Sequence, residues 1–357
     1  MTKTIRLIGL MSGTSLDGLD VAHVEFIITG EHYTFQLIHS KTYVLPESIK
    51  HTLENIPNAL AHAVFKLNQE IGIHYADCVN AFISEHRIEK NTLAAIASHG
   101  QTVFHQPHLG YTVQLGCGTT LAYHTGIQVI NNFRALDIAA GGQGAPLVPI
   151  GDHLLFQGLA EGFLNIGGFA NLSFVRDTKN VAYDIGPGNL PLNAYAQKLG
   201  FAYDDNGQLS KSGTINQTLL ADLNNLAYYG LAAPKSLGTE WLVNSFYPLI
   251  PNDLDPHSVI ATLCEHIAQR IAQEINHHKL ESIYVTGGGA HNTYLLDRIQ
   301  NYTSCKWIIP NKEIIDFKEA IIFAFLGLRY LEGKHNALAS VTGAQKNVCG
   351  GSLHLPC

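Results

Sequence analysis

Glycine and hydroxyl residues interrupt two apolar runs near the start of the chain, in the stretch MSGTSLDG at residues 11–18. The flanking runs have the composition of strands, so the stretch is predicted to form the tip of a β-hairpin. A P-loop would need a lysine before a helix, and a dinucleotide-binding turn would need G-x-G-x-x-G before a helix. The stretch meets neither condition. Small residues let backbone N–H groups converge on an anion, so this is a candidate phosphate-binding turn; an ordinary glycine-rich turn is the alternative.

Two later stretches have the same character. LNIGGFANLSF places Gly167 and Gly168 at the tip of a second predicted hairpin, and its Asn171 adds an amide that can orient a ligand. TGGGAHN, residues 286–292, lies between a predicted strand and a predicted helix. Its three glycines let the chain pass under a flat ring or a phosphate, and the helix N-terminus behind them favours anions. Taken singly, each stretch also fits a simple tight turn.

Asp184 is the candidate catalytic base. In YDIGPGN it is predicted to end a strand, before a sharp turn over residues 186–188, and Asn189 is expected to cap the helix that follows. A carboxylate at a strand end beside a glycine turn is well placed to face a cleft and accept a proton. The alternative is that Asp184 only accepts hydrogen bonds from the backbone of the turn.

Further polar residues are predicted to line the same cleft. HGQT, residues 99–102, follows a buried strand, and RALDIAAGGQGAPLVP, residues 134–149, combines charge with glycines that suit substrate contacts or a hinge. His99, His105 and His108 lie close together in the sequence, but their spacing fits no standard metal site.

The hydrophobic pattern predicts two lobes, residues 1–132 with 335–357 and residues 133–334, each beginning with strands and carrying one glycine hairpin. Two such hairpins and a GGG turn, in this order, are the pattern of the sugar-kinase, actin and heat-shock ATPase superfamily. The expected fold class is therefore α/β: a two-lobed ribonuclease H-like ATPase fold of mixed five-stranded sheets, flanking helices and an interlobe cleft. The predicted strands are residues 5–10, 21–29, 35–45, 93–97, 127–130 and 282–286, and the strand-and-turn pattern starts again in GFLNIGG, FANLSFVR and VAYDIG of the second lobe. The predicted helices are residues 59–86, 120–124, 190–199, 258–277, 318–331 and one from about 292.

Composition excludes several classes of protein. The 357 residues are 46% hydrophobic and 14% charged, which provides for a large core. A net charge of −7 argues against nucleic-acid and membrane partners. Six scattered cysteines without a C-x-x-C pair indicate reduced thiols rather than a zinc site. The first residues lack the apolar core of a signal peptide, so a cytoplasmic location is expected.

Together the motifs resemble those of the anhydro-N-acetylmuramic acid kinases, a family of bacterial peptidoglycan-recycling enzymes. The resemblance runs through MSGTSLDGLD, SHGQTVFHQP, DIAAGGQGAPLVP, LNIGGFANLS, YDIGPGN, APKSLGTEW, TGGGAHN, DFKEAIIFAFLG and SVTGA, which is nearly the whole chain. Two stretches depart from the usual pattern: Asn132 stands where the family usually has Asp, and the tail QKNVCGGSLHLPC is atypical.

The resemblance implies an ATP- and Mg²⁺-dependent reaction in which water opens 1,6-anhydro-N-acetylmuramic acid and O6 takes the γ-phosphoryl group, giving N-acetylmuramic acid 6-phosphate. Asp184 would be the base, and a homodimer is expected. Asp17 or Asp20 could hold Mg²⁺ directly or through water, and Asp17 through water is the expected arrangement. The ATP-binding residues would be Gly13, Thr14, Ser15, Leu16, Asp17, Gly18, Leu19, Asp20, Gly167, Gly168, Gly287, Gly288 and Gly289. The sugar-binding residues would be His99, Gln101, Arg134, Asp137, Gly142, Gln143, Asn171, Gly186, Gly188 and Asn189.

Two other functions fit the same phosphate turns. An ordinary sugar kinase of the superfamily would phosphorylate a free hydroxyl of an amino sugar or a hexose. A non-catalytic ATP-binding switch would close around nucleotide without sugar-dependent turnover.

Overall fold

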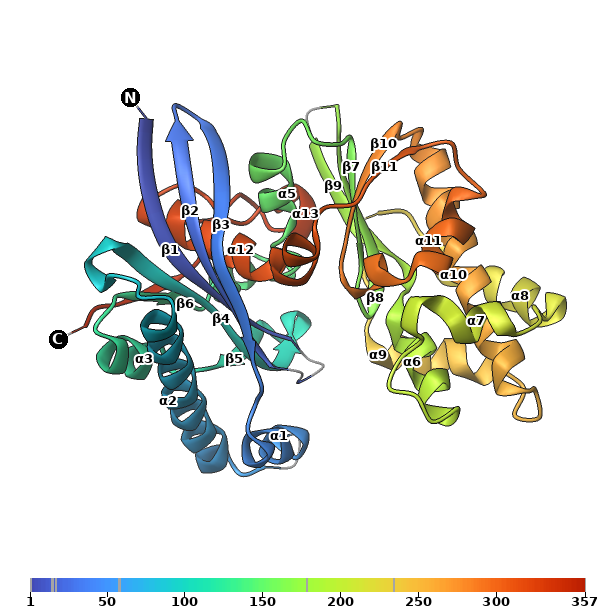
Figure 1. Ribbon diagram of the computed structural model, residues 1–357, viewed down its shortest axis with the longest axis horizontal. Coiled ribbons are helices and arrows are strands. Elements are labelled where there is room, and N and C mark those ends of the chain that lie inside the picture. Colours follow the sequence, from blue (N-terminus) through green and yellow to red (C-terminus); the bar gives the residue numbers. More distant parts are fainter. Residues whose placement is uncertain are drawn as a thin grey trace. The chain divides into compact units, whose positions relative to one another are not determined.

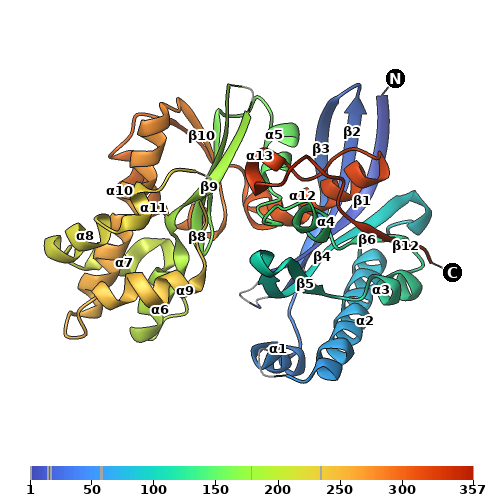
Figure 2. The same ribbon diagram turned by 180° about the vertical axis from the view of Figure 1, so that it is seen from behind.

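The computed structural model describes residues 2–13, 16, 18–56, 59–177, 179–233 and 235–356 (Figures 1 and 2). Thr14, Ser15 and Asp17 of the first predicted phosphate turn lie outside the described residues. The chain forms two compact units: unit 1 comprises Met1–Phe156 and Phe317–Cys357, and unit 2 comprises Gln157–Asp316. The interlobe cleft stays a prediction.

Unit 1 is built on a seven-stranded mixed sheet in the order β12-β6-β4-β1-β2-β3, with β5 paired to β4. Its strands are β1 (Thr2–Ser12), β2 (Leu19–Thr29), β3 (His32–Tyr43), β4 (Leu93–Gln106), β5 (Tyr111–Leu115), β6 (Val129–Asn131) and β12 (Ser352–His354). Its helices are α1 (Glu47–Glu54), α2 (Ala61–Glu85), α3 (Gly118–Thr125), α4 (Ala135–Ala139), α5 (Pro149–Leu155), α13 (Ala339–Thr342) and most of α12 (Lys312–Leu331).

Alternating residues of β1 pack against helices on opposite faces of this sheet. Ile8 and Leu10 are fully buried in one cluster with apolar residues of α2. The intervening Gly9 faces α12, where the carbonyl of Ala320 occupies the place that a Cβ would need. Because successive residues of a strand point to opposite faces, the sheet is covered by α2 on one side and α12 on the other (Figures 1 and 2).

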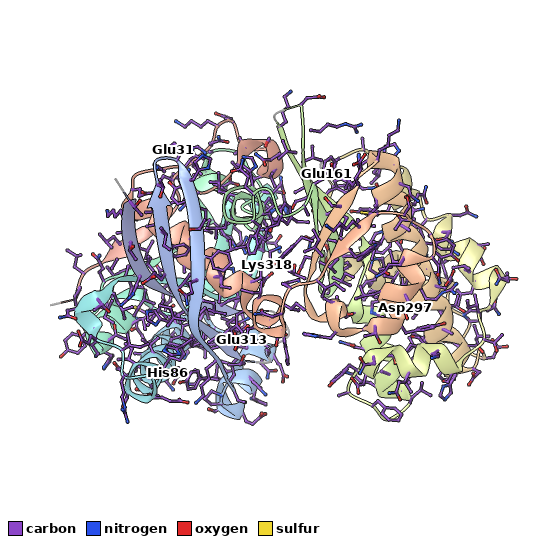
Figure 3. The ribbon with its side chains drawn as sticks, turned by 45° about the horizontal axis from the view of Figure 1, so that its top comes forward. Glu31, His86, Glu161, Asp297, Glu313 and Lys318 are labelled. Atoms are coloured by element: carbon purple, nitrogen blue, oxygen red, sulfur yellow. The ribbon has the colours of Figure 1, made fainter. Side chains whose placement is uncertain are left out.

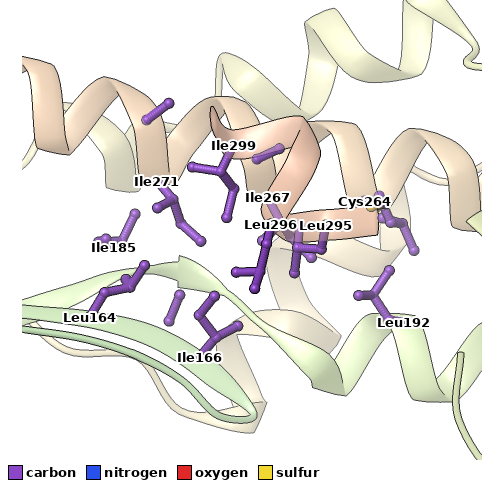
Figure 4. Close-up of a cluster of buried hydrophobic side chains, with 14 of the residues drawn as sticks. Leu164, Ile166, Ile185, Leu192, Cys264, Ile267, Ile271, Leu295, Leu296 and Ile299 are labelled. Carbon is purple, nitrogen blue, oxygen red and sulfur yellow. The ribbon is translucent and has the colours of Figure 1, made fainter. Parts of the chain in front are cut away.

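Unit 2 is built on a five-stranded sheet in the order β11-β10-β7-β8-β9. Its strands are β7 (Gly162–Ile166), β8 (Phe169–Arg176), β9 (Lys179–Pro187), β10 (Ser282–Thr286) and β11 (Lys306–Ile308). Its helices are α6 (Asn189–Lys198), α7 (Gln208–Ser212), α8 (Gln217–Asn224), α9 (Thr239–Trp241), α10 (Pro256–His278) and α11 (Thr293–Gln300). Figure 4 shows its core, where apolar side chains of the sheet pack against α6, α10 and α11.

Helices α10 and α11 of unit 2 begin where the sequence provides a capping side chain. Asp255 precedes α10 and its Oδ2 accepts a hydrogen bond of 3.0 Å from the N–H of Ser258, while Pro256 occupies the first turn. Asn292 precedes α11 and its Oδ1 accepts a hydrogen bond of 2.9 Å from the N–H of Leu295. Each cap satisfies a backbone donor that the helix cannot satisfy itself, so the helix start is fixed within one residue.

Both units have the same strand order and directions. In unit 1, β1, β2 and β3 are antiparallel neighbours, and β4 and β6 follow parallel to β1. In unit 2, β7, β8 and β9 are antiparallel neighbours, and β10 and β11 follow parallel to β7. This duplication confirms the predicted fold class. The predicted five strands are found in unit 2, whereas in unit 1 the hairpin partner β5 and the tail strand β12 bring the sheet to seven.

Most predicted elements are found, with different ends. The meander of three strands, the long helix now seen as α2, and the helices α6, α10, α11 and α12 all form. The strand predicted at residues 93–97 continues to Gln106, because HGQT extends it and then pairs with β5. The tail contributes one strand that was not predicted, β12.

The boundaries of the two compact units differ from the boundaries of the two predicted lobes. Residues 133–156 and 317–334 pack with unit 1 rather than with unit 2. The Nζ atom of Lys318 (labelled in Figure 3) lies 2.6 Å from Asp152 Oδ1, and both side chains are buried. Phe156 packs edge-on against Phe35 of β3 with ring centroids 5.3 Å apart. These contacts keep α5 and most of α12 on the first sheet.

No helix among the described residues is long and apolar enough to cross a membrane.

His23 makes the stability of unit 1 sensitive to acid. Its side chain is 4% exposed, and neither ring nitrogen has a hydrogen-bond partner among the described residues. Burial, together with nearby His39, lowers the pKa of His23 to about 4. The unfolded chain therefore binds a proton between about pH 6.5 and 4 that the folded chain does not, and the folded state loses stability as the pH falls through that range.

We expect His23→Leu to reduce this loss. Between pH 6.5 and pH 5 the free energy of unfolding, measured with urea, should fall by about 1–2 kcal/mol less in the variant than in the parent, because one proton is worth ~1.4 kcal/mol per pH unit. His108→Leu, at an exposed position, is the matched control and should keep the parental slope. Equal slopes in all three proteins would contradict the assignment.

Candidate active site

The first glycine hairpin is braced from the neighbouring strand. β1 and β2 pair as far as Met11 opposite Asp20. Ser12 Oγ, which is buried, donates to Gln101 Oε1 at 2.6 Å, and Gln101 Nε2 donates to the carbonyl of Gly13 at 3.1 Å. Gly18 has no space for a side chain, because the carbonyl oxygen of Tyr43 would lie 2.6 Å from its Cβ. Gln101, predicted to contact substrate, thus holds the base of the hairpin.

The other described residues of this hairpin lie on different sides of it. Leu19 is fully buried in the core of unit 1 and Leu16 packs against that core, so neither side chain is free for a ligand. Asp20 Oδ1 accepts a hydrogen bond of 2.6 Å from Thr42 Oγ1. Any phosphate contact by residues 16 and 19 would have to come from the backbone.

The buried His99 and the half-buried Arg134 form a pair beside this hairpin. Arg134 Nε and Nη2 lie 3.1 Å and 2.8 Å from His99 Nε2, and Arg134 Nη1 donates to the carbonyl of Gly144 at 2.7 Å. Burial and the guanidinium hold the pKa of His99 well below its usual range, so the imidazole is neutral and its Nε2 accepts. The parallel pairing of β1 with β4 ends close by, at Ser12 opposite Gln101, and ligands bind beside the carboxyl ends of parallel strands in α/β sheets.

Asp137 holds the glycine-rich loop that follows. Its side chain is fully buried; Oδ2 accepts from the N–H of Gly144 at 2.8 Å and Oδ1 accepts from Thr342 Oγ1 at 2.7 Å. Gly142 lies so close to this carboxylate that a Cβ would collide with Oδ2. Gln143 is exposed. Asp137 and Gly142 therefore have structural roles, and contacts of the three residues with a sugar stay predictions.

The second glycine hairpin joins the start of α6 in unit 2. The N–H groups of Gly188 and Asn189 donate to the carbonyls of Gly168 and Gly167 at 2.9 Å and 2.8 Å. Gly188 passes so close to the Gly167 carbonyl that no side chain fits there. The expected helix cap is wrong in one detail: Gly188 is the capping residue, and Asn189 is the first residue of α6, with its Nδ2 donating to the Ile166 carbonyl at 3.1 Å.

The GGG turn lies against the same hairpin. Gly287 has φ 83°, which favours glycine, and its Cβ would lie 2.7 Å from Asn165 Oδ1. Gly289 packs directly against the side chain of Ile166. At Gly288 the nearest atom to a Cβ would be Asn189 Nδ2, at 3.5 Å. Two of the three glycines are thus needed for packing, and Gly288 alone borders open space. Three predicted segments far apart in sequence meet at this point.

A row of polar residues crosses the sheet of unit 2. Asn165 of β7 pairs with Thr286 of β10 on one side and with Asn171 of β8 on the other, and Asn171 pairs with Asp184 of β9. Side chains of paired residues lie on the same face, so the four form one row. Their neighbours along each strand are apolar and are buried against the helices on the opposite face.

Asp184 occupies a partly buried position at the end of this row. Its Oδ2 accepts a hydrogen bond of 2.8 Å from the N–H of Leu237, and its N–H donates to the carbonyl of Lys235 at 3.1 Å. Tyr228 Oη donates to the Asp184 carbonyl at 2.7 Å. Burial raises the pKa of Asp184 to about 6, although the Leu237 N–H opposes this effect. The carboxylate thus accepts a backbone hydrogen bond from a separate loop and has the pKa of a base near neutrality.

Gly186 packs toward an aromatic ring, and its contact with substrate stays a prediction. A Cβ at this position would lie 3.3 Å from Cε1 and Oη of Tyr229. Asn171 is half-buried beside Asp184, where its amide can orient a ligand.

Sequence reasoning missed Asn165 and the contact of the segment Lys235–Leu237 with Asp184. Asn165 is a polar residue between two apolar neighbours in LNI, and that alternation was the available signal. Lys235 and Leu237 lie about fifty residues after Asp184, and no local pattern links them to it.

The two departures from the family pattern lie side by side in unit 1. Asn132 has φ 58°, a conformation that Asn tolerates better than most residues, and its Nδ2 lies 3.5 Å from Ser352 Oγ of the atypical tail. β12 pairs there with β6. Both departures thus concern one edge of the first sheet.

Comparisons with known proteins agree with these motifs. The family model described as anhydro-N-acetylmuramic acid kinase matches residues 5–356. The chain is 37% identical to the anhydro-N-acetylmuramic acid kinase of Pasteurella multocida (strain Pm70), over 98% of this chain and 97% of that protein. It is 36% identical to that of Vibrio parahaemolyticus serotype O3:K6, over 97% of each chain. A ROK hexokinase from Thermus thermophilus aligns over 91% of this chain and 99% of its own, at 13% identity and a TM-score of 0.37, a likeness too low to support an argument.

The last two glycines of the GGG turn, Gly288 and Gly289, provide a matched test of the packing. We expect Gly289→Ala to lower the free energy of unfolding by about 1–3 kcal/mol, because the added methyl group overpacks the site at Ile166. Gly288→Ala should change it by less than about 0.5 kcal/mol, as at a site without such packing. Urea denaturation of both variants measures the difference; equal effects would contradict the close approach of the turn to β7.

Proposed function

The chain belongs to the anhydro-N-acetylmuramic acid kinase family, and we propose that it carries out the reaction for which that family is named. The substrates are ATP and 1,6-anhydro-N-acetylmuramic acid, and the products are ADP and N-acetylmuramic acid 6-phosphate. The protein would thus serve cell-wall recycling, and a cytoplasmic location is part of the proposal. Supporting it are the family membership and the environment of Asp184.

The reaction couples two bond exchanges. A water oxygen forms a bond to C1 of the sugar while the C1–O6 bond of the anhydro bridge breaks. O6 forms a bond to the γ-phosphorus while the bond from that phosphorus to the β–γ bridging oxygen breaks. One proton of the water must be removed, and the γ-phosphoryl group takes the electron pair of O6, so no protein acid is needed at the leaving oxygen.

Asp184 is proposed to take the proton of that water. The observation that carries this role is its environment: a carboxylate with a pKa raised to about 6, held by one backbone N–H from Leu237 and lying beside the amide of Asn171. Near neutral pH such a group is ionised yet basic enough to accept a proton in the transition state. Asn171 would orient the sugar or the water.

The glycine turns are proposed to bind ATP. In unit 1 the hairpin from Gly13 to Asp20 would bind phosphate oxygens through backbone N–H groups, and in unit 2 Gly167 and Gly168 would do the same. Gly288, where a Cβ would meet no atom closer than 3.5 Å, leaves a smooth surface on which a nucleotide can lie. Gly287 and Gly289 shape that surface.

The residues of unit 1 predicted to bind sugar have more limited roles. The neutral His99 and the guanidinium of Arg134 are proposed to contact polar groups of the substrate, because their pair lies close to where the parallel pairing of β1 with β4 ends. The exposed Gln143 is proposed as a direct contact. Gln101 and Asp137 are proposed to act by positioning the two loops.

Mg²⁺ is proposed as the cofactor, and the donors present fit it. No group of three His, Cys, Asp or Glu side chains among the described residues has metal-binding geometry. In kinases Mg²⁺ is bound by one or two carboxylates together with phosphate oxygens and water, so the protein supplies only one or two of the ligands. Asp20 at the hairpin is the described carboxylate that suits this role, and Asp17 is proposed to act through water. When bound, Mg²⁺ neutralises charge on the phosphates. The homodimer stays a prediction.

Asp184→Asn tests the base directly. We expect kcat to fall by about 10²–10⁴-fold, the usual contribution of a general base. The Asn side chain can still accept from Leu237, and it removes a desolvated carboxylate, so at pH 7 the variant should be at least as stable as the parent. Sugar-dependent ADP release and thermal unfolding measure the two effects.

Asp222→Asn is the matched control, because Asp222 is exposed in the same unit. It should retain parental activity. Near-normal turnover by Asp184→Asn would refute the base, whereas a large loss of stability in that variant would indicate a structural role.

The pH dependence follows from the same carboxylate. Since burial raises its pKa to about 6, kcat/KM should fall roughly tenfold per pH unit below pH 6, as the base becomes protonated. A fall beginning only near pH 4, the ordinary range of an Asp, would contradict the proposed environment. Initial rates at saturating ATP between pH 4.5 and 8 measure this profile.

An isotope experiment separates this function from an ordinary sugar kinase. Anhydro sugar labelled with ¹⁸O in the bridge should give a product whose label lies between C6 and phosphorus, visible as an isotope shift in the ³¹P NMR signal. Phosphorylation of a free hydroxyl would leave the phosphorus signal unshifted. ATP binding without any sugar-dependent phosphate transfer would instead indicate the switch.

A further inference from the structure

A pocket of about 450 Å³ lies in unit 2 at the edge of the sheet, between β9, α10 and residues 229–233 and 235. It is lined by Tyr183 of β9, whereas Asp184, the next residue, faces the other side of the sheet. The volume is within the range of small-molecule sites and far above that of a single water molecule. The pocket is therefore distinct from the row of polar residues that carries Asp184.

Two cations face the pocket against one carboxylate. Among its described lining residues, Lys235 and Arg270 are the cations and Glu274 is the carboxylate. Arg270 Nη2 lies 3.8 Å from Glu274 Oε1, and Glu274 Oε2 accepts a hydrogen bond of 2.8 Å from Tyr183 Oη. One carboxylate shared in this way leaves an excess positive charge at the pocket.

Most hydrogen-bonding capacity of the Arg270 guanidinium is unused. The residue is 7% exposed and stacks on Tyr229 with the guanidinium carbon 4.0 Å from the ring centre. Nη1 donates to Gln273 Oε1 at 2.7 Å, but Nε is buried without a partner among the described residues. A buried charge with free donors is costly unless an acceptor satisfies it.

Lys235, the second cation, is half-buried. Its Nζ atom lies 5.4 Å from the ring centre of Tyr183 and 4.9 Å from that of Tyr228. Burial lowers the pKa of Lys235. An anion in the pocket would pair with this ammonium group and restore its charge stabilisation.

We propose that this pocket binds a phosphorylated sugar, with the phosphate between Lys235 and Arg270 and sugar hydroxyls on Glu274, Gln273 and His277. The two cations match a phosphate monoester, and the carboxylate, amide and imidazole are donors and acceptors suited to hydroxyl groups. The product of the proposed reaction belongs to this class, and its use as a probe rests on the proposed function.

The bound sugar phosphate also stabilises the segment that holds Asp184. Lys235 contributes its side chain to the pocket and its carbonyl to the N–H of Asp184, and the N–H of Leu237 donates to Asp184 Oδ2. Fixing the Lys235 side chain therefore restrains the backbone between these two hydrogen bonds. We therefore expect the Leu237 amide to exchange its hydrogen more slowly when a sugar phosphate occupies the pocket.

Binding to the full chain tests the proposal. Calorimetric titrations would use glucose 6-phosphate, N-acetylmuramic acid 6-phosphate, glucose and inorganic phosphate, and hydrogen exchange would locate the site. Sugar phosphates should bind at least tenfold more tightly than glucose or inorganic phosphate, and should protect the amides of residues 229–237 and 273–278. Arg270→Gln should weaken this binding at least tenfold, and Lys211→Gln, at an exposed position of the same unit, should not.

Lys235→Gln provides a second variant if Arg270→Gln fails to fold, and it should weaken binding similarly. The parental Kd in both variants, the absence of protection at millimolar sugar phosphate, or equal affinity for inorganic phosphate would each overturn the proposal. Asp184→Asn should retain this binding. A protein without kinase activity but with Arg270-dependent binding would refute the proposed function and leave this site standing.

Discussion

The two-residue period of the strands in unit 2 is the constraint on which the candidate site depends. Leu164, Ile166 and Ile185 are buried against helices on one face, and each buried side chain of this size contributes about 1.5–3 kcal/mol. The residues between them must then face the other way. A slip of one residue would bury Asp184 in the apolar core and expose the core residues, so burial of the apolar face fixes the polar row.

Close approach of backbones is the second requirement of the site. Gly188 lies against the carbonyl of Gly167, and Gly289 lies against Ile166, so three separate segments meet without intervening side chains. Such glycines look functional in the sequence, yet several of them serve packing. What they create is a surface of backbone and small residues, with Gly288 as the open position. The chemistry of the site and the packing of the sheet therefore use the same residues for different reasons.

Much of the fold was predictable because its signals are local. The strand-like apolar runs predicted the three antiparallel strands at the start of unit 1. The helical period of apolar residues predicted α2 and α10, and the glycine turns predicted both hairpins. The added strands β5 and β12 were missed because β5 depends on a pairing partner and β12 on the edge of β6, which are tertiary effects. Asp184 was found from its glycine turn, whereas the hydrogen bond from Leu237 joins distant segments and leaves no pattern in the sequence.

The discontinuity of unit 1 has a consequence for synthesis on the ribosome. Its last part, Phe317–Cys357, supplies most of α12, including Phe323 and Phe325, which are buried against residues encoded hundreds of codons earlier. Unit 2 is a single uninterrupted stretch. During translation the intervening unit can therefore close its core while the N-terminal sheet still exposes an apolar face, so the domain that emerges first is the one completed last.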